Sequence, residues 1–137
     1  MTKYVGQMRQ ITSKEVCMRL SEVMAITQAE CLLPDIDLDR EVHGAFASDL
    51  MSDVLRYDLA DGLLITGLAN PQAIRTAEMA DATAVLLARG KVPSPEMIHL
   101  AEETDIPLLS THITMFETCG RLHVAGLLAA TPHNGRA

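Results

Sequence analysis

Two aspartates placed four residues apart, Asp49 and Asp53, are a pair whose type and spacing could support catalysis. A helix would present both carboxylates on one face, where they could bind a metal ion or divide acid and base work. The structural alternative is that Asp49 caps or charges the positive end of a helix while Asp53 is solvated. Ser48 offers the same choice between a helix cap and a ligand contact. The structural interpretation is simpler, so we assign no catalytic residue.

Cys119 and His123 form a second pair with this spacing, in a segment expected to be helical. They could be metal ligands, but a structural zinc site needs about four such ligands. No further cluster of cysteine and histidine lies near them in the sequence. We therefore expect a cysteine in the core, a half-buried histidine and no metal site.

The glycines Gly62 and Gly67 have the spacing of a phosphate loop. Such a loop continues with lysine and then serine or threonine, which hold the phosphates and magnesium. Here Leu68 and Ala69 occupy those positions, and Gly62 precedes a strand instead of following one. The sequence thus contains no phosphate loop at this point.

The elements that must position these residues alternate between strand and helix. Three short apolar runs predict strands covered on both faces: 63–66, 84–88 and 107–110. A helix start with a capping side chain follows each of them, at Asn70, Ser94 and Thr114. We expect the last helix to reach about Leu128. This alternation predicts a single α/β domain with a largely parallel or mixed sheet flanked by helices.

The amino-terminal part is expected to begin with a helix whose capping box is Thr12–Glu15, continuing through Val16 and Leu20. A strand at 42–47 and a helix from about Asp49 to Tyr57 should follow. The expected organisation is an amino-terminal extension at 1–11, a domain at 12–128 and a flexible tail at 129–137.

Polar residues follow the predicted strands and would meet at one edge of a parallel sheet. Helix amino ends directed to that edge, with Arg89 and Lys91 nearby, would suit a phosphate or carboxylate. The candidate ligand-binding residues are Ser48, Asp49, Asp53, Thr66, Gly67, Asn70, Arg89, Ser110 and Thr111.

One side of the last helix carries little polarity, and a glycine inside a helix costs about 1 kcal/mol relative to alanine. Close approach of another backbone would explain Gly120. The side could pack on the domain's own sheet or form a subunit interface, for which the candidates are Phe116, Gly120, His123 and Leu127.

Bulk composition narrows the class of protein. The 137 residues suit one domain, and a hydrophobic content of 48% argues against disorder. A net charge of −7 and an aromatic content of 3% argue against nucleic-acid binding. Three separated cysteines suit a reducing compartment. With no signal peptide and no apolar run of the roughly 20 residues that span a bilayer, we expect a cytoplasmic protein.

Several segments together resemble the DRTGG-domain family, which is similar to the amino-terminal domain of HPr kinase/phosphorylase. The matching segments are Asp39–Val42 with Gly44, Ala47–Val54, Ile106–Thr111 and Phe116–Leu122. The resemblance covers about residues 12–128.

The resemblance implies a regulatory or ligand-sensing module without established catalytic residues. Such modules occur beside CBS domains and as small stand-alone proteins, some encoded near iron-only hydrogenases. Kinase activity in the HPr kinase family belongs to a separate domain with a phosphate loop, so we do not expect an enzyme.

Two functions remain open. The first is a non-catalytic module that binds a small anionic metabolite or nucleotide as a homodimer, without a cofactor. The alternative is an accessory subunit that acts by protein–protein contact in a redox system of the iron-only hydrogenase type. Neither involves nucleic acid or a membrane.

Overall fold

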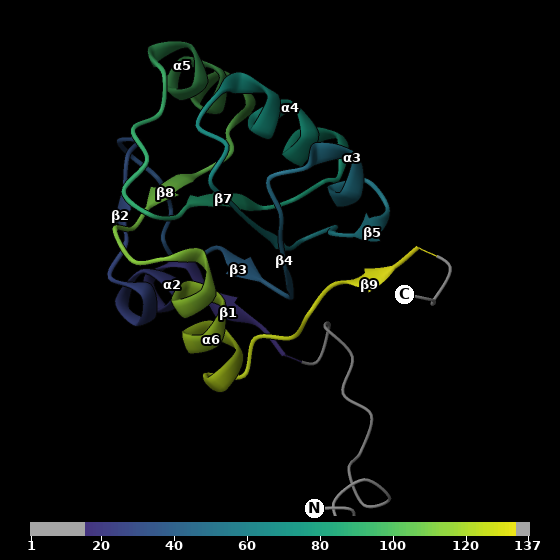
Figure 1. Cartoon of the computed structure of the whole chain (residues 1–137). Helices are drawn as coiled ribbons and strands as arrows, with labels where there is room; N and C mark the ends of the chain where they lie inside the picture. The colour runs from purple at the N-terminus through teal and green to yellow at the C-terminus, as the bar shows by residue number, and fades with distance from the viewer. Residues whose placement is uncertain (1–15, 134–137) are drawn as a thin grey trace, which may run out of the picture.

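A five-stranded sheet forms the middle layer of a three-layer α/β/α domain (Figure 1). The computed structural model describes residues 16–133. The strand order is β2-β8-β7-β6-β4, in which β4, β6, β7 and β8 are parallel and β2 pairs antiparallel with β8. The strands are β2 (Glu30–Cys31), β4 (Ala45–Ala47), β6 (Leu63–Thr66), β7 (Ala84–Leu87) and β8 (Leu108–Ser110). The predicted α/β class and mixed sheet are confirmed.

The two central strands, β6 and β7, are buried along their whole length. Their register pairs Leu63 with Ala84 and Thr66 with Leu87. Because helices cover both faces, each of these strands can be apolar at consecutive positions. This is why short continuous apolar runs identified them correctly.

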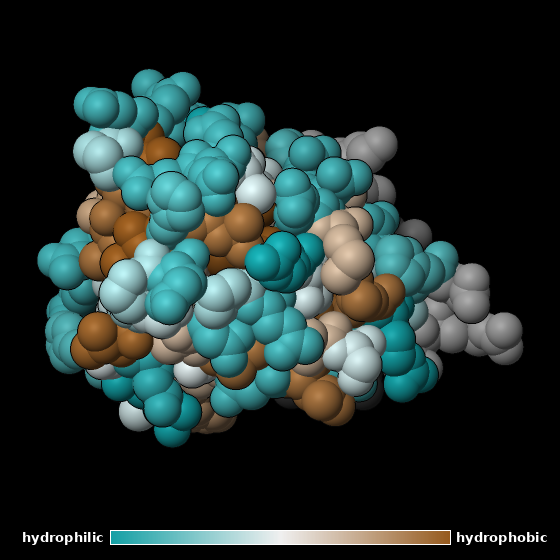
Figure 2. Space-filling model, turned by 90° about the horizontal axis from the view of Figure 1, so that it is seen from above, coloured by the Kyte–Doolittle hydropathy of each residue, from teal (hydrophilic) through white to brown (hydrophobic). Residues whose placement is uncertain are grey.

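Helices α3 (Met51–Val54), α4 (Pro71–Met79) and α5 (Pro95–Thr104) share one face of the sheet. Helices α2 (Leu20–Thr27) and α6 (Met115–Val124) share the other. Viewed from above, the side with α3, α4 and α5 is mainly hydrophilic, with smaller hydrophobic areas between (Figure 2). No helix within residues 16–133 is long and apolar enough to cross a membrane.

Three predicted helix starts are confirmed by their capping bonds. The Asn70 side chain accepts from the Gln72 N–H at 3.0 Å, and the Ser94 hydroxyl accepts from the Met97 N–H at 3.1 Å. The Thr114 hydroxyl accepts from the Glu117 N–H at 3.2 Å. Each bond satisfies one of the N–H groups that a helix leaves unpaired at its start.

The first helix begins later than predicted. It starts at Leu20, and Val16 lies outside it; the expected capping box at 12–15 falls outside the described residues. Met18–Arg19 instead forms strand β1, which pairs antiparallel with β3 (Glu41–Val42). A cross-strand pairing between distant segments thus replaces the local helical pattern.

The predicted strand at 42–47 is divided into two. After β3, the His43 N–H donates to the Asp61 carbonyl and the Gly44 carbonyl accepts from Leu63 N–H, both at 2.8 Å. These bonds hold the chain where it passes from the two-stranded β1–β3 sheet into β4 of the central sheet. The following helix, expected to run from 49 to 57, is only α3.

The last helix ends at Val124 instead of about Leu128, and Gly126 adopts φ +108°, where L side chains are rarely found. The chain then runs beside β4, where Ala45 N–H donates to the Leu128 carbonyl at 2.9 Å and Ala130 N–H donates to Ala45 at 2.8 Å. Strand β9 (Thr131–Pro132) pairs with β5 (Tyr57–Asp58). Residues 129–133, which belong to the expected flexible tail, thus pair with β4 and β5.

Candidate functional site

The carboxyl ends of four parallel strands lie along one edge of the central sheet. Ser48 and Asp49 follow β4, Gly67 follows β6, Arg89 lies two residues after β7, and Thr111 follows β8. The strand order therefore brings together the residues that the sequence analysis placed at such an edge. Open α/β sheets commonly bind ligands at this position.

Asp49 links the first two strands at this edge. Its Oδ1 accepts from the Thr66 hydroxyl at 3.1 Å and from the Gly67 N–H at 2.6 Å. The expected capping role is wrong, because the N-cap position of α3 is Leu50 and no side chain caps this helix. Asp49 precedes the helix that contains Asp53, so the two carboxylates do not share a helical face.

Arg89 approaches the same glycine. A Cβ atom on Gly67 would lie 3.1 Å from Arg89 Nη2 and 3.3 Å from both carboxylate oxygens of Asp49. The absence of a side chain at Gly67 thus leaves space for a guanidinium and a carboxylate to approach one point. This gives Gly67 a steric role at the edge.

A tight turn holds Arg89 in place. Arg89 and Gly90 both have φ +66°, in the left-handed region. The Arg89 N–H donates to the Ile113 carbonyl and the Gly90 N–H donates to Thr111, both at 2.8 Å. A non-glycine residue in this region is uncommon, and such backbone strain concentrates at functional sites.

Two helix amino ends lie beside this turn region. The Ser94 N–H donates to the Ala69 carbonyl at 3.3 Å, which joins the start of α5 to the segment before α4. Both helices direct the positive end of their dipole to this region, which favours an anion, although a proline at the first position and the Asn70 and Ser94 caps already use most of their first N–H groups. The edge therefore combines an exposed arginine with two helix starts.

Several other candidate residues already have partners within the fold. The Thr66 hydroxyl also accepts from Leu68 N–H at 3.1 Å, and the Thr111 hydroxyl donates to the Thr27 carbonyl at 2.6 Å. Ser48 accepts from Leu50 N–H at 3.0 Å, and Asn70 caps α4. These side chains shape the edge, whereas the Arg89 side chain is exposed and makes no hydrogen bond to another residue within 16–133.

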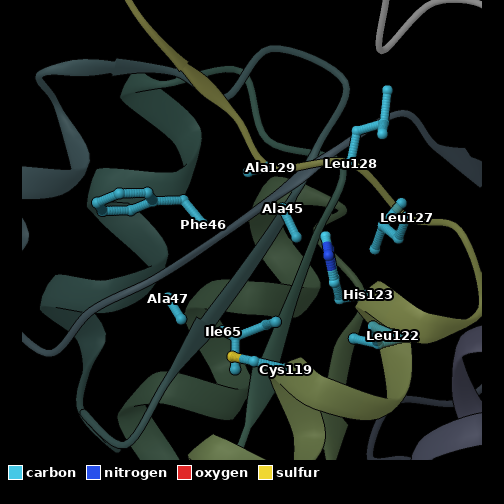
Figure 3. A pocket seen from close by; sticks show the side chains of 10 residues that line it. All are labelled: Ala45, Phe46, Ala47, Ile65, Cys119, Leu122, His123, Leu127, Leu128 and Ala129. Atoms are coloured by element: carbon cyan, nitrogen blue, oxygen red, sulfur yellow. The ribbon is translucent and has the colours of Figure 1, made fainter. Parts of the chain in front are cut away.

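A cavity of about 300 Å³ opens between β4 and α6, on the face of the sheet that α2 and α6 cover (Figure 3). Ala45 and Ala47 are too small to fill it, while Phe46 lies on the opposite side and stacks on Tyr57 with ring centroids 4.2 Å apart. These two alanines were not among the residues predicted from the sequence. A small–large–small alternation on an edge strand is the signal that could have identified them.

Cys119 and His123 both line this cavity from α6. Burial raises the pKa of the Cys119 thiol above its ordinary value, which favours the neutral form. His123 is exposed instead of half-buried as expected. Among the residues from 16 to 133, no three histidine, cysteine, aspartate or glutamate side chains gather in a way that could hold a metal ion.

The candidate interface residues divide between surface and core. Phe116 is 91% exposed, and none of the described residues has an atom within 4 Å of a Cβ placed on Gly120. Leu127 is only 3% exposed and packs with Leu122, so its assignment to an interface is wrong. Because the helix ends at Val124, Leu127 turns back to the sheet.

Arg40 has a structural role that the sequence did not reveal. Its guanidinium donates to both carboxylate oxygens of Asp105, at 2.9 and 2.8 Å, and to the Asp105 carbonyl at 3.0 Å. Asp105 is the C-cap of α5 in the left-handed conformation. The pair therefore ties the segment before β3 to the end of α5.

The order of strands and helices defines a single α/β domain, and comparison with known proteins gives its family. The chain belongs to the DRTGG domain family, whose model matches residues 22–125. No protein of curated function matches the sequence.

One solved structure that this chain resembles contains the CBS and DRTGG domains of the regulatory region of Clostridium perfringens pyrophosphatase, complexed with its activator diadenosine tetraphosphate. The TM-score is 0.62 and the sequence identity is 19%. The match covers 85% of this chain and 51% of that one, so the chain spans about half the length of its neighbour. At this identity the likeness establishes the fold.

Proposed function

We propose that this protein is a non-catalytic regulatory module that binds a small anionic metabolite or nucleotide and works as a homodimer. The observation that carries the proposal is the exposed Arg89, held by a left-handed turn beside Gly67 at the carboxyl edge of the sheet. A guanidinium binds phosphate or carboxylate oxygens through parallel hydrogen bonds. The two nearby helix starts favour the same kind of ligand.

Asp49 places a negative charge beside this site, and this charge repels an anionic ligand. Its carboxylate already accepts from Gly67 N–H, a donor that an incoming anion could otherwise use. Attraction to Arg89 and repulsion from Asp49 both scale with the charge of the ligand, so charge alone does not select between anions. A phosphate has more acceptor oxygens than a carboxylate, so it can accept from Arg89 and still bond a second donor. This favours phosphorylated ligands over simple carboxylates.

The structural neighbour supports nucleotides as the first class to test. Its regulatory region is complexed with an activator that is a dinucleoside polyphosphate. We propose the same class for this chain, through its shared fold and its own arginine.

Thermal unfolding of the full chain with a panel of nucleotides and phosphorylated metabolites tests the proposal. A ligand at 100 times its Kd should stabilise the folded state by about 2.7 kcal/mol. The Arg89→Ala variant should lose most of this shift, since a hydrogen bond to a charged group contributes about 1.5–3 kcal/mol. Asp49→Asn should bind the same anion more tightly, because one repulsive charge is removed.

Arg75→Ala is the matched control, because Arg75 is exposed on α4 and its loss changes the net charge equally. It should keep the shift of the wild-type chain. Unchanged thermal stability of the wild-type chain across the panel would contradict the proposal. If both arginine variants lose the ligand-induced thermal shift equally, the shift depends on net charge and not on Arg89.

The second candidate function is an accessory subunit of a redox enzyme, acting by protein contact. The exposed Phe116 and Val124 on α6 favour it. The chain, purified at native expression levels, should then retain an identifiable redox-enzyme subunit that Phe116→Glu releases. Recovery of the chain alone would argue against this function.

A further inference from the structure

Helix α6 presents a row of exposed residues to the surface. Phe116 and Val124 are 91% and 88% exposed, and Gly120 lies midway between them. The three residues are spaced by four, so they follow one another along one side of the helix. The row lies along an open groove of about 600 Å³, lined also by Ile26, Thr114, Glu117 and Arg121.

This row differs from the other exposed hydrophobic side chains. Leu50, Leu55, Met79 and Val92 are the remaining large ones among the described residues, and none lies on α6. Single exposed hydrophobic residues are normal on protein surfaces, whereas a contiguous row rimmed by charges marks an interaction site.

We propose that this row, Phe116–Gly120–Val124, is the isologous interface through which two copies of the chain dimerise. The proposal rests on the homodimer in the proposed function and names the surface that forms it. With Gly120 on the two-fold axis, α6 meets the partner's α6 in antiparallel orientation. Phe116 then lies opposite the partner's Val124, and the row complements itself.

Gly120 fits the crossing point of such a pair. Rows of residues four apart pack against each other at a helix crossing angle of about −50°, with the axes closest where the rows cross. The position of a Cβ on Gly120 is open to solvent within one copy. A second backbone approaching there explains a glycine that no contact among residues 16–133 requires.

The charges beside the row also complement a second copy. Glu117 and Arg121 lie on the same side of the row, and Arg121 Nε donates to Glu117 Oε2 at 3.0 Å within one chain. In a two-fold pair of antiparallel helices, each flank faces the same flank of the other copy. Glu117 therefore lies beside the partner's Arg121, and the partner's Glu117 lies beside Arg121. The two Arg121 side chains also approach each other near the axis, but the two attractive pairs outnumber this one repulsive pair, which favours association.

Sedimentation velocity of the full chain over a range of concentrations tests the interface. The wild-type chain should sediment as a dimer, and Phe116→Glu should convert it to a monomer. Phe116 has almost no contacts inside the chain, so this substitution should leave the fold intact. Val92→Glu is the matched control, because Val92 is 84% exposed and belongs to the loop before α5 and not to the row, so this variant should stay dimeric.

Complementary charge reversals give a second, stricter test. Glu117→Arg and Arg121→Glu each place like charges across the two-fold axis, so each chain alone should be mainly monomeric. An equimolar mixture should form heterodimers, because opposite charges then meet across the interface.

The outcomes separate the interface from the rest of the proposed function. A wild-type monomer at all concentrations would overturn both the homodimer and this interface. A dimer that survives Phe116→Glu, or a mixture that stays monomeric, would overturn this interface alone. Anion binding at Arg89 is measured by thermal shift and fails or holds independently.

Discussion

At Gly67 a hydrogen atom in place of a methyl group lets a carboxylate and a guanidinium share the space beside one backbone position. The neighbouring strands β4 and β6 bring Asp49 to this glycine, and the turn after β7 brings Arg89. The chemistry of the edge thus depends on three residues that are distant in the sequence and that a regular strand order places together.

Alanine at Gly67 is expected to affect ligand binding more than stability. The new Cβ would meet the far ends of two flexible side chains, at 3.1 and 3.3 Å, so these can move. Alanine at Gly62 would instead meet the Gly44 and Leu59 carbonyl oxygens at 3.0 Å, which are backbone atoms. We expect Gly62→Ala to lose roughly 1–3 kcal/mol of unfolding free energy and Gly67→Ala less than about 1 kcal/mol.

Urea denaturation of both variants checks the order of the two losses. The thermal shift with a bound anion should be lost in Gly67→Ala, because Arg89 is displaced. An equal loss of stability in both variants would mean that the strand-end side chains are as rigid as backbone.

Asp49 is expected to stabilise the fold mainly through the bonds that its oxygen accepts. Asp49→Ala removes the acceptor for Thr66 and Gly67, and should lose about 1 kcal/mol. Asp49→Asn keeps an acceptor oxygen in place and should lose less than half as much. Equal losses in urea denaturation would show that the charge, and not the accepted bonds, stabilises this edge.

At the scale of the element, β4 explains both the stacked aromatic pair and the cavity. Successive side chains of a strand point to opposite faces. Phe46 therefore packs towards Tyr57 on the side of α3, whereas Ala45 and Ala47 face α6 and leave space. Three consecutive residues thus determine how well each face of the sheet edge is packed.

Enlarging Ala47 should stabilise the protein, because Ala47→Val adds methyl groups towards the cavity of about 300 Å³. Filling a cavity commonly adds about 0.5–2 kcal/mol, and valine also suits a strand. Ala84→Val is the matched control: Ala84 is fully buried in β7, and overpacking there should cost about 1–3 kcal/mol. Opposite signs in thermal denaturation confirm the prediction, and a loss in both variants contradicts it.

The elements whose signals are local could be predicted from the sequence. Asn70, Ser94 and Thr114 cap their helices through neighbouring N–H groups, so a few residues contain the whole signal. The capping prediction for Asp49 failed because its partners, Thr66 and Gly67, lie in another strand. Local patterns give the elements, and long-range pairing decides the roles of their polar residues.

At the scale of the whole molecule, the parts that the sequence did not reveal are all made by pairing between distant segments. Strand β1 pairs with β3, β5 pairs with β9, and residues 128–130 run beside β4. None of these short segments has an apolar run or an alternation long enough to be recognised. Residues 128–130 pair with the outer edge of β4, whereas β1 with β3 and β5 with β9 form two separate two-stranded sheets.

The last residues of the described chain should therefore contribute to global stability. Ending the chain at residue 127 removes the bonds of Leu128 and Ala130 to Ala45, and the bond from His133 N–H to the Arg56 carbonyl. At about 0.5–1.5 kcal/mol for each net hydrogen bond, the loss should be roughly 2–4 kcal/mol. A chain ending at residue 133 keeps these contacts and is the reference. Equal denaturation midpoints for the two chains would show that β4 needs no partner on its outer side, whereas the expected difference makes residues 128–133 part of the folded domain.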